Sequence, residues 1–198
     1  MGKLLTATSL IACMLVVVQS TGRSLRGVPP SSPSPAFTLG ENLQARDFEP
    51  YPGYAGKLVV TGTVQLAQEG SGADATQVMT FTLAGTEEAC GTANVTGIAN
   101  ACGINIDVGK NCSDASTVGG HFWNRTAIAE DPWQNVMYAT VHLSAFEDGL
   151  KVTTGLSNAE IADHVLVVHD VSGARIACSP VTMTIRNPHL SDRTQAPP

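Results

Sequence analysis

The pattern of hydrophobic and polar side chains along the chain predicts β-strands. Leu58–Leu66 and Gln77–Ala84 are rich in β-branched residues and partly alternate between apolar and polar positions, which is typical of strands with one buried face. The segment Gln68–Gly72 between them has the composition of a turn, so we expect the two strands to pair as a hairpin. No stretch has the sustained period of 3.6 residues that indicates an amphipathic helix.

Further strands are expected in the second half of the chain, separated by turns rich in Gly, Asn and Asp. They are Gly103–Val108, Asn135–Leu143, Leu150–Gly155, Val165–Asp170 and Arg175–Ile185. Many short strands joined by turns are typical of an antiparallel sandwich or barrel. The sequence therefore predicts an all-β fold.

The N-terminus has the layout of a secretory signal peptide. Lys3 precedes the apolar run Leu10–Val18, which is too short to span a bilayer, and small and polar residues follow from Gln19. An uncleaved membrane anchor is the competing interpretation, and the shortness of the run argues against it. We expect residues 1–22 to be removed and the mature protein to be secreted, with no membrane segment.

The remaining chain divides into three parts by composition. Residues 23–56 are rich in Pro and Ser and are predicted to form a linker, residues 57–186 a folded domain, and residues 187–198 a disordered tail. The tetrad at 23–26, R-S-L-R, resembles the R-x-L-R motif of host-targeted effectors from oomycete plant pathogens. It also fits a basic processing site or a plain basic linker.

The charge and the length of the chain exclude some classes of function. The 198 residues carry a net charge of −6, with 43% hydrophobic residues to build a core. No cluster of Lys and Arg lies in the predicted domain, which argues against a nucleic-acid partner.

The expected secretion determines how the cysteines and the glycosylation sequons are interpreted. The mature chain would hold four cysteines, Cys90, Cys102, Cys112 and Cys178, which an oxidising compartment would join into disulfides. Four cysteines allow three pairings, and the spacing does not choose between them. Three sequons begin at Asn94, Asn111 and Asn124, and Asn94 is the first candidate acceptor.

The stretch 102–124 concentrates the candidate chemistry of the chain. Asn105 and Asp107 lie on one face of a predicted strand, and a loop with the flexible pair Gly119 and Gly120 leads to His121. If the chain folds back after the loop, Asn105, Asp107 and His121 converge on a small polar site.

This stretch and the segment Val165–Cys178, V-L-V-V-H-D-V-S-G-A-R-I-A-C, together resemble the copper/zinc superoxide dismutase family. In that family a G-φ-H-φ-H strand supplies two copper ligands and a later G-P-H-F supplies the histidine that bridges copper and zinc. A V-V-H-E segment then gives the last copper ligand, and S-R-x-A-C-G gives an anion-guiding arginine and a disulfide cysteine. The resemblance covers residues 57–183 and implies a Greek-key antiparallel β-sandwich.

The resemblance assigns roles to individual residues. His121 matches the bridging histidine, His169 the last copper ligand, and Arg175 the guiding arginine. Cys112 and Cys178 match the disulfide of the family, which leaves Cys90 and Cys102 to pair with each other.

Two positions depart from the family at the copper site. Asn105 and Asp107 stand where the first strand of the family has histidines. An amide is a poor ligand for Cu(II), and a carboxylate favours harder ions. The segment between His121 and Tyr138 also lacks the zinc histidines of the family and holds only two carboxylates, Glu130 and Asp131.

We therefore expect a secreted superoxide dismutase-like domain with impaired catalysis. Weak binding of one copper or zinc ion by Asp107, His121 and His169 is the most that we expect, and the alternative is that no metal is bound. Two other functions stay open: an active dismutase, which converts superoxide to oxygen and hydrogen peroxide at an unusual metal site, and a secreted effector or partner-binding module. The sequence indicates no particular protein partner and no oligomeric state.

The other notable side chains are expected to be structural. His142, His164 and His189 match no ligand of the family and are interpreted as surface or strand residues. Asp114 and Asp131 are interpreted as turn and loop residues. Large aromatics usually pack in a core, and this prediction covers Trp123, Trp133 and Tyr138.

Overall fold

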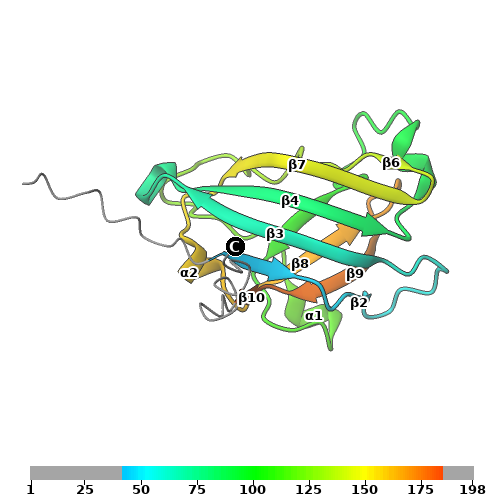
Figure 1. The fold of residues 1–198 in the computed structure, drawn as a ribbon, viewed down its shortest axis with the longest axis horizontal. Coiled ribbons are helices and arrows are strands. Elements are labelled where there is room, and N and C mark those ends of the chain that lie inside the picture. The colour runs from blue at the N-terminus through cyan, green and yellow to red at the C-terminus, as the bar shows by residue number, and fades with distance from the viewer. Residues whose placement is uncertain (1–41, 185–198) are drawn as a thin grey trace, which may run out of the picture. The chain divides into compact units, whose positions relative to one another are not determined.

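The computed structural model describes residues 42–184, in which two antiparallel β-sheets pack face to face (Figure 1). The six-stranded sheet has the order β10-β1-β3-β4-β7-β6, and the four-stranded sheet has the order β2-β9-β8-β5. The prediction of an all-β fold is confirmed, and the two facing sheets form a β-sandwich. The predicted signal peptide, the R-S-L-R tetrad and the predicted tail lie outside the described residues.

The six-stranded sheet contains the longest strands of the domain. Its strands are β1 (Leu43–Ala45), β3 (Thr61–Glu69), β4 (Thr76–Ala84), β6 (Thr140–Val141), β7 (Ser144–Thr153) and β10 (Thr182–Met183). The predicted hairpin is confirmed, because β3 and β4 pair from Thr61↔Ala84 to Glu69↔Thr76. Gly70 closes this hairpin with a φ of +68°, and a Cβ there would lie 2.5 Å from the carbonyl oxygen of Asp74.

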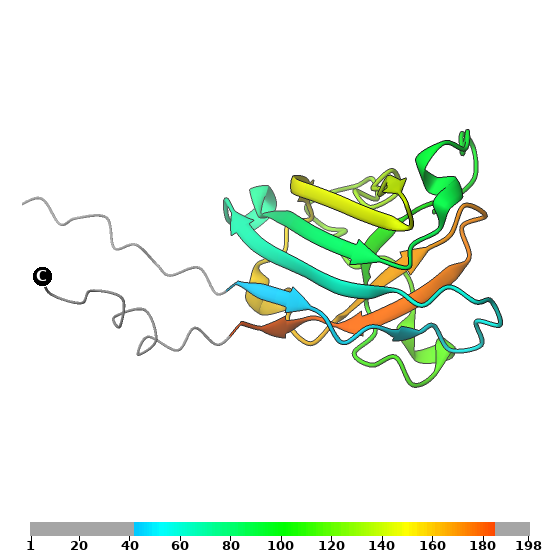
Figure 2. The ribbon, with the colours of Figure 1, turned by 45° about the vertical axis from the view of Figure 1, so that its right-hand side comes forward.

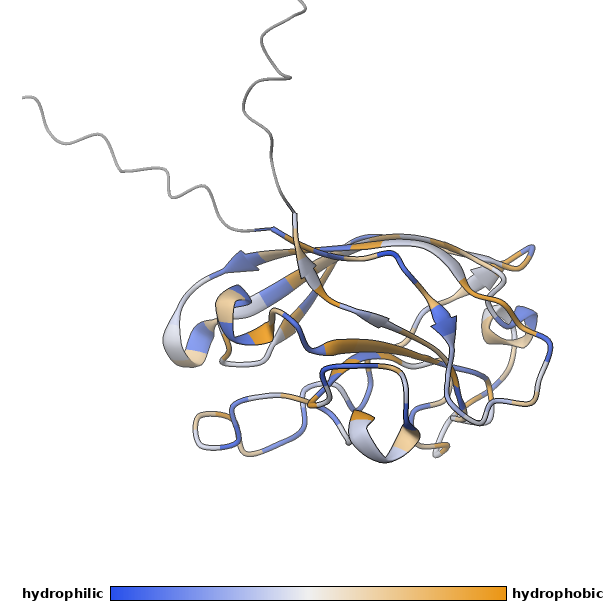
Figure 3. Cartoon of the chain, turned by 90° about the horizontal axis from the view of Figure 1, so that it is seen from below, coloured by the Kyte–Doolittle hydropathy of each residue, from blue (hydrophilic) through white to orange (hydrophobic). Residues whose placement is uncertain are grey.

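The four-stranded sheet carries the candidate site. Its strands are β2 (Glu49–Pro50), β5 (Ile104–Asp107), β8 (Val165–His169) and β9 (Arg175–Pro180). Strand β8 is buried along its whole length, and Figure 3 shows one strand of the domain in which the hydrophobic colour runs along most of the length. One face of β8 packs in the core between the sheets, so another part of the chain must cover its outer face.

Short helices complete the connections between the strands. They are α1 (Ala115–Val118), α2 (Asn158–Ile161) and the 3₁₀ turns η1 (Gly72–Asp74) and η2 (Glu88–Gly91). Asp114 caps α1 by accepting a hydrogen bond from the amide of Ser116, and Ser157 with Glu160 forms a capping box on α2. The prediction that Asp114 serves a turn agrees with this cap. None of the helices in residues 42–184 has the length and apolar character needed to cross a membrane.

The folded domain begins earlier than the predicted boundary at residue 57. Strand β1 pairs with β3 on one side and β10 on the other, and β2 pairs with β9, so the region predicted as linker supplies one strand to each sheet. Leu43 and Ala45 are fully buried. The linker prediction is therefore wrong for residues 43–50, because a strand of two or three residues is too short to show a hydrophobic period in the sequence.

The strand predictions in the second half are correct in place but not in length. In the segment Asn135–Leu143, which was predicted to be a strand, burial alternates, with Val136, Tyr138 and Thr140 buried, yet only Thr140–Val141 is a strand. His142 and Leu143 have φ values of +51° and +57°, which end the extended run in a tight turn.

Strand β7 starts at Ser144, six residues before its predicted beginning. Its register against β4 shifts between Met79 and Thr80, and Gly149, with a φ of +94°, lies opposite this shift as the extra residue of a β-bulge. The bulge breaks the alternation that would have identified the strand in the sequence.

The main core fills the space between the sheets. Val64, Leu66, Met79, Phe81 and Leu83 reach it from the six-stranded sheet, and the four-stranded sheet contributes Ile104, Ile106, Leu166, Val168 and Ile176. All ten side chains are almost completely buried, and this burial is the main source of the stability of the sandwich.

A second apolar cluster lies on the outer face of the four-stranded sheet. It joins Val165, Val167 and Cys178 of the sheet to Cys112 and Val118 of the loop that carries α1. The disulfide Cys112–Cys178 holds this loop against the sheet. Both predicted disulfides are confirmed, since Cys90 pairs with Cys102. Figure 2 shows α1 on the far side of the four-stranded sheet from β3 and β4.

Candidate functional site

The loop after β5 returns to the same strand and places His121 opposite Asp107. The amide of Val108 donates to the carbonyl of Gly120 over 2.9 Å, and the amide of Phe122 donates to that of Ile106 over 2.8 Å. Asp107 and His121 are partners in an isolated antiparallel bridge, so their side chains project from the same face. The predicted return of the chain thus brings these two residues together.

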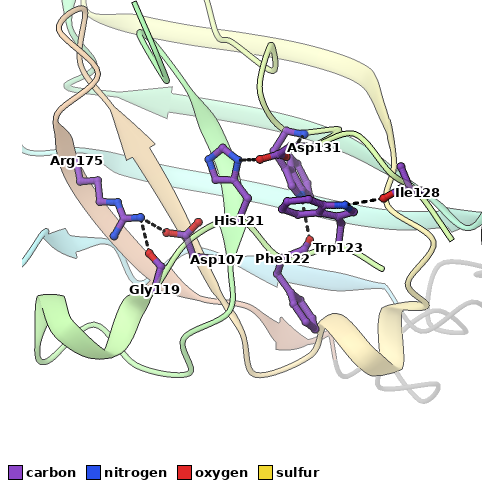
Figure 4. A network of polar contacts seen from close by, with 9 residues as sticks. Asp107, Gly119, His121, Phe122, Trp123, Ile128, Asp131 and Arg175 are labelled. Carbon is purple, nitrogen blue, oxygen red and sulfur yellow. Dashed lines mark hydrogen bonds and ion pairs between the residues drawn. The ribbon is translucent and has the colours of Figure 1, made fainter. Parts of the chain in front are cut away.

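Asp107 is fully buried and pairs with a cation. One of its carboxylate oxygens, Oδ2, lies 2.9 Å from Nη2 of Arg175, whose side chain is 25% exposed (Figure 4). The distance is that of an ion pair, although the angles are not those of a hydrogen bond. Burial raises the pKa of Asp107 to about 7, against the opposing effect of the charge on Arg175.

Arg175 is held by two further groups. Its Nη1 donates to the hydroxyl of Tyr51 over 2.8 Å, and its Nη2 donates to the carbonyl of Gly119 over 2.5 Å. The guanidinium carbon also lies 5.3 Å from the centre of the Tyr51 ring, within range of a cation–π contact. Arg175 therefore joins β9 to β5, to the loop after β5 and to the segment after β2.

His169 is a buried histidine at the end of β8. Its side chain is 1% exposed, and neither ring nitrogen has a hydrogen-bond partner among residues 42–184. Gly103 lies against the ring, because a Cβ at Gly103 would be 3.3 Å from Nδ1. Burial, followed in size by the charge of Arg175, lowers the pKa of His169 to about 4. The imidazole is therefore neutral at pH 7.

Asn105 lies in β5 opposite Val167, on the face that carries Asp107. It is 1% exposed, and neither its amide nitrogen nor its oxygen has a hydrogen-bond partner within the described part of the chain. A buried amide without partners lowers stability by about 1–3 kcal/mol. Asn105 thus adds polarity to the site at a cost in stability.

His121 has a partner that was predicted to be only a loop residue. Its Nδ1 lies 2.8 Å from Oδ2 of Asp131, and the two side chains are 9% and 28% exposed. The other oxygen of Asp131 accepts a hydrogen bond from the amide of Trp133 over 2.9 Å. Asp131 therefore both stabilises its own turn and orients the imidazole of His121, with the Asp107–Arg175 pair on the other side (Figure 4).

The aromatic residues around His121 hold the segment in place. Trp133 is 1% exposed and donates from its indole nitrogen to the carbonyl of Phe122 over 2.9 Å. Trp123 donates to the carbonyl of Ile128 over 3.0 Å, and Arg125 lies 4.3 Å above its ring. Tyr138 is buried, and its hydroxyl donates to the carbonyl of His169 over 2.7 Å. These contacts agree with the packing roles that were predicted.

The remaining histidines make no hydrogen bond or ring contact with the side chain of Asp107, His121 or His169 in the described part of the chain, or lie outside it. His142 is exposed in the turn before β7. His164 is 8% exposed and stacks on Phe122 with ring centres 3.9 Å apart. His189 lies outside residues 42–184.

In their present arrangement, these side chains do not form the copper site that the family resemblance implies. Within residues 42–184, no three side chains of His, Cys, Asp or Glu come together in a group that could hold a metal ion. The carboxylate of Asp107 faces a guanidinium, and Nδ1 of His121 faces Asp131. Both ring nitrogens of His169 lack a hydrogen-bond partner among residues 42–184, and the hydrogen bond of His121 to Asp131 involves Nδ1 and leaves its Nε2 uninvolved.

Comparison with known proteins gives no independent assignment. No protein-family model matches this chain, and no curated protein is significantly similar to it. The interpretation of the site therefore depends on the residues and the geometry described above.

Proposed function

We propose that this chain is a secreted protein with a Greek-key sandwich of the copper/zinc superoxide dismutase type, in which a buried ion pair has replaced the metal centre. The domain then serves outside the cell as a disulfide-stapled scaffold without efficient dismutase activity. The observation that carries this proposal is the 2.9 Å contact between Arg175 and the fully buried Asp107.

The ion pair opposes the chemistry of dismutation in two ways. Dismutation needs a metal that cycles between two oxidation states, with imidazole ligands and an open position for the superoxide anion. A metal ion at Asp107 would lie next to the guanidinium of Arg175, and like charges in a buried site repel strongly. The positive charge that would attract superoxide is also paired with a carboxylate, which weakens its long-range effect.

Several features support the relationship to the dismutase family. The disulfide Cys112–Cys178 joins the loop before His121 to strand β9, as the resemblance implies. Asp107 lies opposite His121, and His169 lies on β8, the strand that pairs with β5. The two disulfides also fit the oxidising compartments of the secretory pathway.

Residual metal binding is the second candidate function. Its support is His169, a buried imidazole with two unpartnered nitrogens beside the bridge pair of Asp107 and His121. Two histidines and one carboxylate are a known ligand set for divalent metals. Binding would require Asp107 to release Arg175, so we expect it to be weak, whereas the contact of Asp131 with Nδ1 of His121 leaves Nε2 of His121 available to a metal.

The test is a superoxide assay on the secreted, disulfide-bonded protein after loading with copper and zinc. The proposal predicts dismutation no faster than that of the His169→Ala variant treated in the same way. Fast dismutation by the wild-type protein that is lost in His169→Ala would overturn the proposal and favour an active enzyme with an unusual metal site.

A further inference from the structure

An open cleft of about 400 Å³ lies on the surface, and none of the side chains of the candidate site lines it. One wall belongs to residues 90–102, here called the stapled loop because the Cys90–Cys102 disulfide closes it. The other wall belongs to the segment 134–137. The side chains that define the cleft are Val95, Thr96, Ile98, Gln134, Asn135 and Met137.

The lining of the cleft is uncharged and mixes two kinds of surface. Gln134, Asn135 and Thr96 offer amide and hydroxyl groups. Ile98 and Met137 are 44% and 49% exposed, which leaves two large apolar side chains facing solvent in one hollow. Such a surface suits a neutral ligand that carries hydroxyl and amide groups together with apolar patches.

Asn94 stands directly before the first residues of the lining and begins the sequon Asn94-Val95-Thr96. Its side chain is exposed, and its Oδ1 accepts a hydrogen bond from the amide of Thr96 over 3.1 Å. This turn leaves Nδ2, the atom that would carry a glycan, without a partner among the described residues. The sequon is thus compatible with a glycan at the edge of the cleft.

The other two sequons are placed differently. Asn124 is half-buried, and its Nδ2 donates to the carbonyl of Gly155 over 3.3 Å. A glycan on that atom would have to fit against the buried backbone at Gly155. Asn111 is exposed, but it lies in the loop of the other disulfide, where its Oδ1 accepts hydrogen bonds from Ser113 and Thr117. Neither Asn111 nor Asn124 lines the cleft.

We propose that an N-linked glycan on Asn94 covers this cleft, with its acetamido sugars packed on Ile98 and Met137. Acetamido sugars combine hydroxyl groups, an amide and a methyl group, which matches the lining. The proposal rests on the secretion that is part of the proposed function, because sequons are glycosylated in secreted proteins. It does not depend on the state of the metal site.

The linkage requires an activated donor, a polyprenyl pyrophosphate-linked oligosaccharide of the secretory pathway. Nδ2 of Asn94 forms a bond to the anomeric carbon of the first sugar. The bond from that carbon to the pyrophosphate oxygen breaks, the pyrophosphate leaves with the bonding electrons, and the amide loses one proton.

The experiment compares secreted wild-type protein with Asn94→Gln and with the control Asn111→Gln, which removes a sequon outside the cleft. Peptide mapping by mass spectrometry measures the occupancy of Asn94. Dilute hydrogen peroxide then oxidises exposed methionines to sulfoxides, and the rate at Met137 is divided by the rate at Met183, which is 39% exposed and does not line the cleft.

We expect Asn94 to carry a glycan and the oxidation ratio to be several-fold lower in the wild-type protein and Asn111→Gln than in Asn94→Gln. Enzymatic removal of the glycan from folded wild-type protein should raise the ratio in the same way without a substitution. An unoccupied Asn94 in secreted protein, or an equal ratio with and without the glycan, would overturn this inference and leave the proposed function untouched. Failure of the chain to be secreted would instead overturn the extracellular function and the inference together.

Discussion

Asp107 and Arg175 form an ion pair between two strands that are not neighbours. Asp107 ends β5 and Arg175 begins β9, and β8 lies between them in the four-stranded sheet. Their side chains meet at 2.9 Å on the outer face, and the loop that carries α1 is fastened to the same guanidinium through Gly119. The pair therefore closes the face on which the resemblance places a metal centre.

Loss of the arginine should destabilise the domain. Arg175→Met leaves the fully buried carboxyl of Asp107 without its cation, and removal of one partner of a buried ion pair typically costs about 3–5 kcal/mol. We expect a loss of about 3 kcal/mol at pH 9, where Asp107, with a pKa of about 7, is ionised in the wild-type protein, and a smaller loss at pH 7, where the carboxyl can take up a proton instead. Urea unfolding monitored by tryptophan fluorescence measures the change.

The double variant Arg175→Met with Asp107→Asn is the control for this effect. It removes the orphaned charge, so it should recover most of the lost stability. If Arg175→Met alone were neutral, or if the second substitution gave no recovery, the ion pair would not have the role described here.

Asp107 and His169 should give opposite pH dependences of stability. The pKa of Asp107 rises from 3.8 to about 7 on folding, so the folded state holds a proton that the unfolded chain has lost, and stability falls as the pH rises through this window. The pKa of His169 falls from 6.5 to about 4. The unfolded chain then binds the extra proton, and stability rises with pH over that range.

The two contributions partly cancel in the wild-type protein, and single variants should separate them. In Asp107→Asn the free energy of unfolding should increase as the pH rises from about 4 to about 6.5, because only the effect of His169 remains. In His169→Gln it should decrease between about pH 4 and 7. Slopes of equal sign in the two variants, from urea titrations across this range, would contradict the pKa shifts.

Truncation at the boundary predicted from the sequence should prevent folding. A chain that begins at Lys57 lacks β1 and β2 and exposes the edges of β3 and β9 to which they pair. It also loses the buried side chains of Leu43 and Ala45 and the hydroxyl of Tyr51 that binds Arg175. A chain that begins at Leu39 keeps all of these contacts.

We expect cooperative thermal unfolding by calorimetry for the chain from Leu39 and none for the chain from Lys57. Equal transition temperatures for the two chains would show that the short strands are dispensable. That result would support residue 57 as the start of the folded domain, as predicted from the sequence.

The sequence predicted the parts of the fold that have a regular pattern or a local signal. The hairpin of β3 and β4 follows from alternation and a glycine-rich turn, and β8 follows from its unbroken apolar run. The start of the domain was missed because β1 and β2 owe their strand geometry to long-range pairing with β3, β9 and β10. Pairing between distant segments leaves little trace in a short stretch of sequence.

The site was predicted only in part for a similar reason. Asp107 and His121 were expected to converge, and they are bridge partners. Asp131 was interpreted as a loop residue, although it was one of only two carboxylates in the segment after His121. The sequence offers no signal for the pairing of Asp107 with Arg175, because their distance depends on how the strands are ordered in the sheet and on a loop anchored by a disulfide.

The most direct measurement of the central claim is the amount of copper bound per chain by the wild-type protein and by the double variant Asn105→His with Asp107→His. The variant restores the two histidines that the dismutase resemblance expects in β5 and frees Arg175 from its carboxylate. If the site is a dismutase-type centre closed by an ion pair, the wild-type protein binds copper weakly or not at all after dialysis, and the variant retains much more. Equal copper in the two proteins, or stoichiometric copper in the wild-type protein alone, would contradict this account.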